Sequence, residues 1–256
     1  MSRRHASDVS IPAGSETIVA ALQVPAAAKG LVLFAHGSGS SRHSPRNELV
    51  ADVLYDAGFA TLLLDLLTPD EERIDRRTGH LRFDIDFLAQ RLVAATQWAR
   101  RQPALAALPC SYFGASTGAA AALEAAASLP GEICAIVSRG GRPDLARRLK
   151  EVRVPVLLIV GGADPETLQA NREASQSLRA ETELTVLQGQ HDGGVDLGHT
   201  RQERARPGGG QHVYLGSGEA ALEGDEQAVG HDHVAYPGGS DDQYPLEYNV
   251  HVAKVI

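Results

Sequence analysis

The pentapeptide Gly114-Ala115-Ser116-Thr117-Gly118 places a serine between two glycines, after an apolar run and before a stretch of alanines. In a tight turn from strand to helix, glycines at these positions avoid collisions with neighbouring backbone, and the turn lifts the serine hydroxyl above the carboxyl edge of a sheet. The first N–H groups of the following helix point at the same place and favour an oxyanion. The pattern therefore predicts Ser116 as a nucleophile, with a glycine-rich loop that carries no chemistry as the alternative.

A serine hydroxyl is a weak nucleophile at neutral pH, so it needs a base and an acid that orients the base. Asp164 follows the apolar run 154–160, and His191 follows the run 184–187. The order serine, aspartate, histidine is typical of a strand-to-helix nucleophile turn. The alternatives are that Asp164 caps a nearby helix and that His191, one of ten histidines, is a solvated side chain; His199 is the second candidate for the base.

A second oxyanion donor is expected in the loop 36–41, His-Gly-Ser-Gly-Ser-Ser, which follows the apolar run 31–35. Glycines there let the backbone approach a substrate, so the N–H of Ser38 or Gly39 can pair with that of Thr117. His36 in the same loop is a candidate substrate-binding residue. The loop can also be interpreted as a phosphate cradle, but no Gly-Lys-Ser/Thr follows it and its spacing does not suit a dinucleotide fingerprint.

Arginines follow another strand-like run, in Ser138-Arg139-Gly140-Gly141-Arg142. Arg139 is a candidate for binding a substrate carboxylate or phosphate, and an ion pair with a local carboxylate such as Asp144 is the alternative. The charged segment 68–84 is too long for a plain connection. It is predicted either to cover the pocket or to be a solvated loop.

Histidines at 231, 233 and 212, with Asp232, superficially suggest metal ligands, but they lack cysteines, a helix or an imposed geometry. We therefore expect no metal site and no cofactor. Cys110 and Cys134 both lie in apolar runs and are predicted to be reduced, inert core thiols.

The elements that position these residues follow from the apolar pattern. Apolar runs alternate with helical patterns, and the runs are continuous, as expected for parallel strands that are covered on both faces. The fold class is therefore α/β, with a mostly parallel central sheet and helices on both faces. Strands are expected at 8–12 and 17–24 (an antiparallel edge hairpin), 31–35, 60–65, 110–113, 133–138, 154–160 and 184–187, and helices at 47–55, 85–99, 117–129, 144–150 and 166–180.

Composition limits the function classes. The formal net charge is −8 and 43% of the 256 residues are hydrophobic. The charge argues against nucleic acid or an anionic membrane surface as a partner. No run approaches the roughly 18 apolar residues of a membrane span, so we expect a cytoplasmic protein that acts on a small molecule. The sequence makes no prediction of oligomeric state.

The chain changes character after His191. Residues 193–256 hold 12 of the 26 glycines, no phenylalanine and one isoleucine. Little apolar area is available there to offset the entropy of ordering. We therefore expect a domain at 1–191 and a poorly ordered tail at 192–256, in which 199–211 is linker or loop and the last seven residues add at most a short strand.

Four segments together resemble the α/β-hydrolases grouped with dienelactone hydrolase: HGSGSSRHSPRN, YFGASTGAAAAL, VSRGGRPDLA and VLLIVGGAD. The resemblance covers about residues 8–190 and implies a mostly parallel, eight-stranded sheet with a site at its carboxyl edge. Dienelactone hydrolase itself has a cysteine where this chain has Ser116. Relatives also follow the catalytic histidine with an apolar pair and a final helix, whereas this chain continues with Asp192-Gly193-Gly194.

The predicted function is hydrolysis of a small ester, lactone or other acyl compound through an acyl-enzyme on Ser116. His191 would move the proton, Asp164 would orient it, and N–H groups of Thr117 and Ser38 would hold the oxyanion. The alternative is a hydrolase-like scaffold without turnover that serves as a binding or interaction module, because the missing final helix displaces the histidine.

Overall fold

The computed structural model describes residues 6–187 and the backbone of 200–205 and 213–215. Its sheet has the strand order β1-β2-β4-β3-β5-β6-β7-β8-β9-β10. The strands are β1 (Ser7–Ala13), β2 (Glu16–Gln23), β3 (Gly30–Ala35), β4 (Phe59–Leu64), β5 (Cys110–Ala115), β6 (Ile133–Arg139), β7 (Val156–Gly161), β8 (Thr182–Leu187), β9 (Thr200–Ala205) and β10 (Val213–Leu215).

Strands β3 to β8 are parallel to one another, and β1 and β2 form an antiparallel hairpin at one edge. In β3, β4, β5 and β7 every residue is buried. This explains the continuous apolar runs, because a strand covered on both faces has no solvent side to mark with polar residues. The predicted mostly parallel sheet and its edge hairpin are confirmed.

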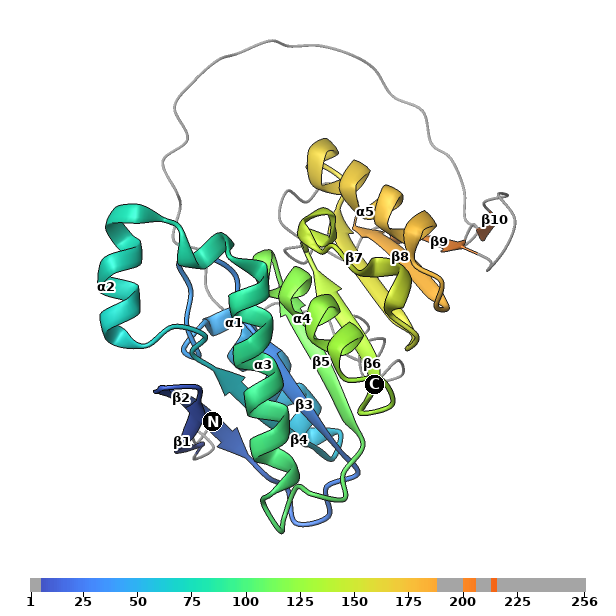
Figure 1. Cartoon of the computed structure of the whole chain (residues 1–256). Helices are drawn as coiled ribbons and strands as arrows, with labels where there is room; N and C mark the ends of the chain where they lie inside the picture. The colour runs from blue at the N-terminus through green and yellow to red at the C-terminus, as the bar shows by residue number, and fades with distance from the viewer. Residues whose placement is uncertain (1–5, 188–199, 206–212, 216–256) are drawn as a thin grey trace, which may run out of the picture.

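Helices cover both faces of the sheet. The α-helices are α1 (Pro45–Asp56), α2 (Pro69–Thr78), α3 (Ile85–Arg100), α4 (Thr117–Ser128) and α5 (Pro165–Ser177). Helix α1 packs on the face that carries Val32 and Phe34. Helices α3, α4 and α5 lie on the opposite face, toward the viewer in Figure 1.

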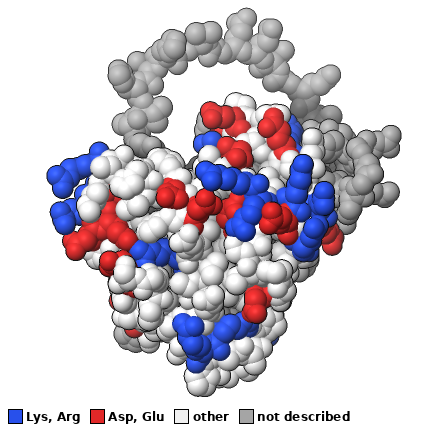
Figure 2. All heavy atoms as spheres, in the orientation of Figure 1, with Lys and Arg blue, Asp and Glu red and all other residues white. Residues whose placement is uncertain are grey.

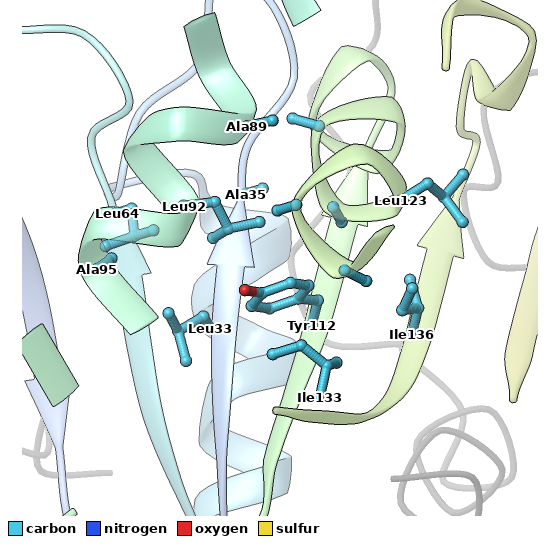
Figure 3. Close-up of a cluster of buried hydrophobic side chains, with 14 of the residues drawn as sticks. Leu33, Ala35, Leu64, Ala89, Leu92, Ala95, Tyr112, Leu123, Ile133 and Ile136 are labelled. Atoms are coloured by element: carbon cyan, nitrogen blue, oxygen red, sulfur yellow. The ribbon is translucent and has the colours of Figure 1, made fainter. Parts of the chain in front are cut away.

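The larger core lies between the sheet and the pair α3–α4 (Figure 3). Leu92 and Ala95 of α3 face Leu33 of β3, and Tyr112 of β5 fills the centre. The Tyr112 hydroxyl is buried but lies 2.7 Å from the Thr96 hydroxyl, so its polar end is satisfied. Small alanines on α4 let this helix approach the sheet closely directly behind Ser116.

The predicted helix at 144–150 is wrong. Two short 3-10 helices stand there, η2 (Pro143–Leu145) and η3 (Leu149–Glu151). The buried carboxylate of Glu124, on α4, accepts hydrogen bonds from the backbone N–H groups of Arg147 and Arg148 and from Arg148 Nε at 2.7 Å. A partner far away in sequence thus takes the donors that a continuous helix would have used.

Segment 68–84 is not a plain loop. Helix α2 begins with a capping box in which the Thr68 side chain accepts from Glu71 N and the Glu71 side chain accepts from Thr68 N. A 3-10 helix, η1 (Leu81–Phe83), follows it. The buried Asp75 carboxylate ties the two together by accepting from the N–H groups of Leu81 and Arg82.

Two further sequence expectations differ from the structure. Residues 200–205 form strand β9, antiparallel to β8, where a linker was expected; the free edge of β8 offers a ladder that overrides weak local propensity. Cys110 is buried as predicted, but Cys134 is exposed. The domain boundary at 191/192 and the last seven residues lie outside the described part of the chain.

In the described ranges no helix is long and apolar enough to cross a membrane.

Candidate active site

Ser116 lies at the tip of the turn between β5 and α4, at the carboxyl edge of the sheet. Its backbone has φ 51° and ψ −123°, and among the described residues it is the one non-glycine residue with a positive φ. Such a conformation costs on the order of 1–3 kcal/mol. A strained serine at the junction of a central strand and a helix is the geometry of a nucleophile turn.

The two flanking glycines are required by their surroundings. A Cβ on Gly114 would lie 2.5 Å from Ala119 Cα, and a Cβ on Gly118 would lie 2.2 Å from the carbonyl oxygen of Ala35. Backbone atoms cannot move away cheaply, so any larger residue would push α4 off β5 or β3. Gly114 and Gly118 therefore avoid collisions with neighbouring backbone, as the sequence pattern predicts.

The loop after β3 lies directly against Ser116. A Cβ on Gly37 would lie 2.8 Å from Ser116 Cβ and 3.6 Å from Ser116 Oγ. Ser40 N–H donates to Gly37 O at 3.2 Å, and Gly39 has φ 73°, as a type II turn requires. This turn leaves Ser38 and Gly39 exposed, beside the start of α4.

Thr117 is the first residue of α4, so its N–H has no acceptor within the helix. Thr117, Ser38 and Gly39 line the same cavity. The structure thus brings the three sequence-predicted oxyanion residues together around one space. Ser116 is not itself among the residues that line this cavity, but its neighbour Thr117 is.

His36 holds the loop in place. Its Nδ1 lies 2.8 Å from Gly37 O, and its Nε2 accepts from Leu66 N–H at 3.1 Å. These partners require the neutral ring with the proton on Nδ1. Burial lowers the pKa of His36 below its usual value, against smaller opposing contributions from the hydrogen bond to Gly37 and from nearby carboxylates. Because both ring nitrogens are engaged within the protein, His36 fixes the loop. It also lines the cavity beside Ser116, and its role in binding a substrate stays a prediction.

Asp164 stands where the sequence predicts it, just beyond the carboxyl end of β7. Its side chain accepts from Thr167 N–H at 3.0 Å and so caps α5. The capping alternative is therefore realised, and one carboxylate can cap a helix and orient an imidazole with different lone pairs. His191 and His199 lie outside the described residues.

The two arginines near β6 have separate roles. Arg142 makes a bidentate pair with Asp144, with contacts of 2.7 to 3.2 Å. Arg139 donates to Asn47 Oδ1 at 3.0 Å and lies over the Phe113 ring, 5.6 Å from its centroid. The predicted local ion pair holds for Arg142, whereas Arg139 contacts α1.

The thiol of Cys110 has no part in the site. Burial raises the pKa of Cys110 to about 12, so Cys110 stays a protonated thiol in the core. No cluster of metal-ligating side chains occurs in the part of the chain that the structure describes, and residues 212 and 231–233 lie outside it.

The cavity beside Ser116 has a volume of about 450 Å³. One wall is the loop 36–41 and the opposite wall is α2 with η1. Of the two alternatives for segment 68–84, the one in which it covers the pocket is therefore realised. Its helix was not predicted, although the Thr68-x-x-Glu71 capping pattern marks the start of one. The residues of that wall and of the floor are Asp65, Leu66, Leu67, Pro69, Glu72, Asp75, Arg76, Arg82 and Leu88.

The strand order and the strained serine at the carboxyl edge define the class of the chain as an α/β-hydrolase fold. Comparison with models of known protein families gives no match. The crystal structure of dienelactone hydrolase from Anabaena variabilis is 49% identical, covers 76% of this chain and 92% of its own, and superposes with a TM-score of 0.72. The chain therefore belongs to the dienelactone hydrolase-like family of α/β-hydrolases.

Other relatives support the fold or extend beyond it. Est1E from Butyrivibrio proteoclasticus is 16% identical over 73% of this chain and 90% of its own, with a TM-score of 0.61, and shows the fold alone. Two Mycobacterium tuberculosis proteins, each named "Putative phosphoribosyl transferase", are 52% identical over 183 residues. The match covers 71% of this chain, which spans 40% of the length of these curated relatives.

Proposed function

We propose that the chain is a serine hydrolase of small esters, lactones or other acyl compounds. Ser116 Oγ attacks the carbonyl carbon, His191 takes the hydroxyl proton and then gives it to the leaving group, and Asp164 orients His191. The N–H groups of Thr117 and of Ser38 or Gly39 hold the oxyanion. Water then attacks the acyl-enzyme and releases the acid and free Ser116.

The strained backbone of Ser116 carries this proposal. A positive φ at a non-glycine residue persists only where the surrounding structure over-determines it. Here two glycines that cannot bear a Cβ and the contact with Gly37 do so. The family relation to dienelactone hydrolase supports hydrolysis. Because the sequence resemblance places Ser116 where dienelactone hydrolase is expected to have a cysteine, the proposal does not extend to dienelactone as a substrate.

The name of the mycobacterial relatives does not lead us to propose transferase activity for this chain. The larger part of each of those proteins lies outside the matched region. The serine turn at 114–118 and the oxyanion loop at 36–41 of this chain are instead parts of acyl transfer to water. Location in the cytoplasm, the absence of a cofactor and the separate tail at 192–256 stay predictions.

The test is labelling with a fluorescent phosphonate, together with turnover of short p-nitrophenyl esters. We expect the wild-type protein and Ser177→Ala, a distant serine variant on α5, to label and turn over. Ser116→Ala should not label at all. His191→Ala should lose at least about a hundredfold in turnover, the scale of general-base catalysis, whereas His199→Ala should not.

Asp164 needs a variant that separates capping from catalysis. Asparagine caps a helix about as well as aspartate, so Asp164→Asn should keep the urea midpoint while turnover falls. If the folded wild-type protein neither labels nor turns over, the scaffold alternative replaces this proposal. If turnover survives in Ser116→Ala, the nucleophile is wrong.

A further inference from the structure

The cavity beside Ser116 is lined by α2 and is called here the cavity under α2. It lies on one side of Ser116, and the proposed acid, Asp164, lies on the other. His36 follows β3 and Asp65 follows β4, and both line the cavity. Asp164 follows β7. In the sheet β4 and β3 precede β5, whereas β7 and β8 come two and three strands after it. The serine at the end of β5 therefore stands between the cavity and Asp164.

This order sets the direction of the substrate. The base must contact both Ser116 and Asp164 and hand its proton to the leaving group, so the leaving group faces the β7 side of Ser116. The carbonyl oxygen sits at the N–H groups of Thr117 and Ser38, which line the cavity. The acyl chain extends from the carbonyl carbon away from the leaving group. It therefore enters the cavity under α2.

The charged groups that line this cavity are paired within the protein. Asp75 is buried, with its side chain 1% exposed, and binds Arg82 Nε at 2.5 Å. Asp65 forms a salt bridge with Arg42. Glu72 forms one with Arg76, one helical turn away, at 3.7 Å. Leu66, Leu67 and Leu88 supply apolar surface. Figure 2 shows both signs of charge interspersed over α2, at the left.

We propose that the cavity under α2 is the acyl subsite and that it selects an uncharged acyl group over one that carries a carboxylate. A carboxylate placed there would lose water without gaining an unpaired cation, which is unfavourable. The inference deepens the proposed function and rests on it for the orientation of the substrate. Glu72 and Arg76, which line the cavity, are the proposed specificity-determining residues. Their pair is exposed, so either residue can be changed without loss of the fold.

The test uses two nearly isosteric substrates, p-nitrophenyl methyl adipate and mono-p-nitrophenyl adipate, which differ by the charge at the end of the acyl chain. We expect the wild-type kcat/KM to be at least tenfold higher for the neutral ester. Glu72→Gln leaves Arg76 unpaired and should lower this ratio by about threefold to tenfold, as one unit charge within several ångströms would do. Arg76→Gln should raise it by a similar factor.

Asp70→Asn is the matched control. Asp70 is on the same helix, is 86% exposed, pairs with Arg73 and does not line the cavity. This variant should leave the ratio unchanged. If neither Glu72→Gln nor Arg76→Gln shifts the ratio, or if the wild type prefers the charged ester, the proposal is overturned.

A binding measurement separates this proposal from the proposed chemistry. Methyl NMR signals of Leu66 and Leu88 should shift on titration with hexanamide, and at least tenfold more adipamic acid should be needed for the same shift. This result does not require Ser116 to react, so it would stand even if phosphonate labelling failed. Equal shifts with both amides, or none with hexanamide, would refute the acyl subsite.

Discussion

At the scale of single residues, the oxyanion loop depends on hydrogen bonds within the protein. His36 fixes the oxyanion loop through a donor to Gly37 O and an acceptor for Leu66 N–H. If Nε2 were protonated, its N–H would face the backbone N–H of Leu66, and the Leu66 N–H would lose its acceptor. Protonation of His36 therefore opposes the folded loop.

This arrangement predicts a loss of stability on the acid side. Because burial lowers the pKa of His36 in the folded protein, the unfolded chain binds more protons as the pH falls below about 6.5. Stability contributed by the neutral ring is present above that pH and is lost below it. Urea midpoints at pH 7.5 and 5.5 should differ more in the wild type than in His36→Gln. His43→Gln, a change at a histidine that is 62% exposed, should keep the wild-type difference, and equal differences in all three proteins would contradict the prediction.

At the scale of elements, what could be predicted from the sequence depended on whether the cause was local. The buried parallel strands were predicted because their apolar runs are continuous, and the turn at Ser116 because its glycines lie next to it in the chain. The segment 144–150 could not be predicted, because its conformation depends on Glu124. Helix α2 does have a local signal, the capping box of Thr68 and Glu71, but the many charged residues of the segment favoured a loop and the helix was not predicted.

The Glu124 contacts predict an unusually large loss of unfolding free energy when this one buried carboxylate is replaced. Glu124→Gln replaces an acceptor of three donors on 147–148, so urea unfolding should show a loss of about 2–4 kcal/mol. Glu132→Gln is the matched change, because Glu132 forms a half-exposed pair with Arg100. It should cost less than about 1 kcal/mol. Similar losses in the two variants would mean that Glu124 does not hold the η2–η3 segment.

At the scale of the whole molecule, the cavity wall formed by α2 is attached differently from a helix that packs on the sheet, such as α3. Helix α3 buries eight residues against the sheet, six of them apolar, whereas Asp75 is the one buried residue of α2. Helix α2 projects from the body at the left of Figure 1. Besides its links to η1 it is anchored by the pair between Glu71 and Arg91, at 2.5 Å, and Arg91 in turn donates to Ala13 O. The wall over the acyl subsite is therefore tied by polar contacts to a body held by apolar packing.

Such an attachment predicts where the molecule opens first. Local opening is cheapest where little apolar surface is exposed by it, so backbone amides of α2 should exchange with deuterium at least about a hundredfold faster than those of α3. Glu71→Gln should accelerate exchange in α2 and leave α3 unchanged, because it weakens one anchor and no apolar contact. Hexanamide should slow exchange in α2 by filling the cavity beneath it. If α2 and α3 were equally protected, α2 would be as firmly attached as the helices on the sheet, and the prediction would be contradicted.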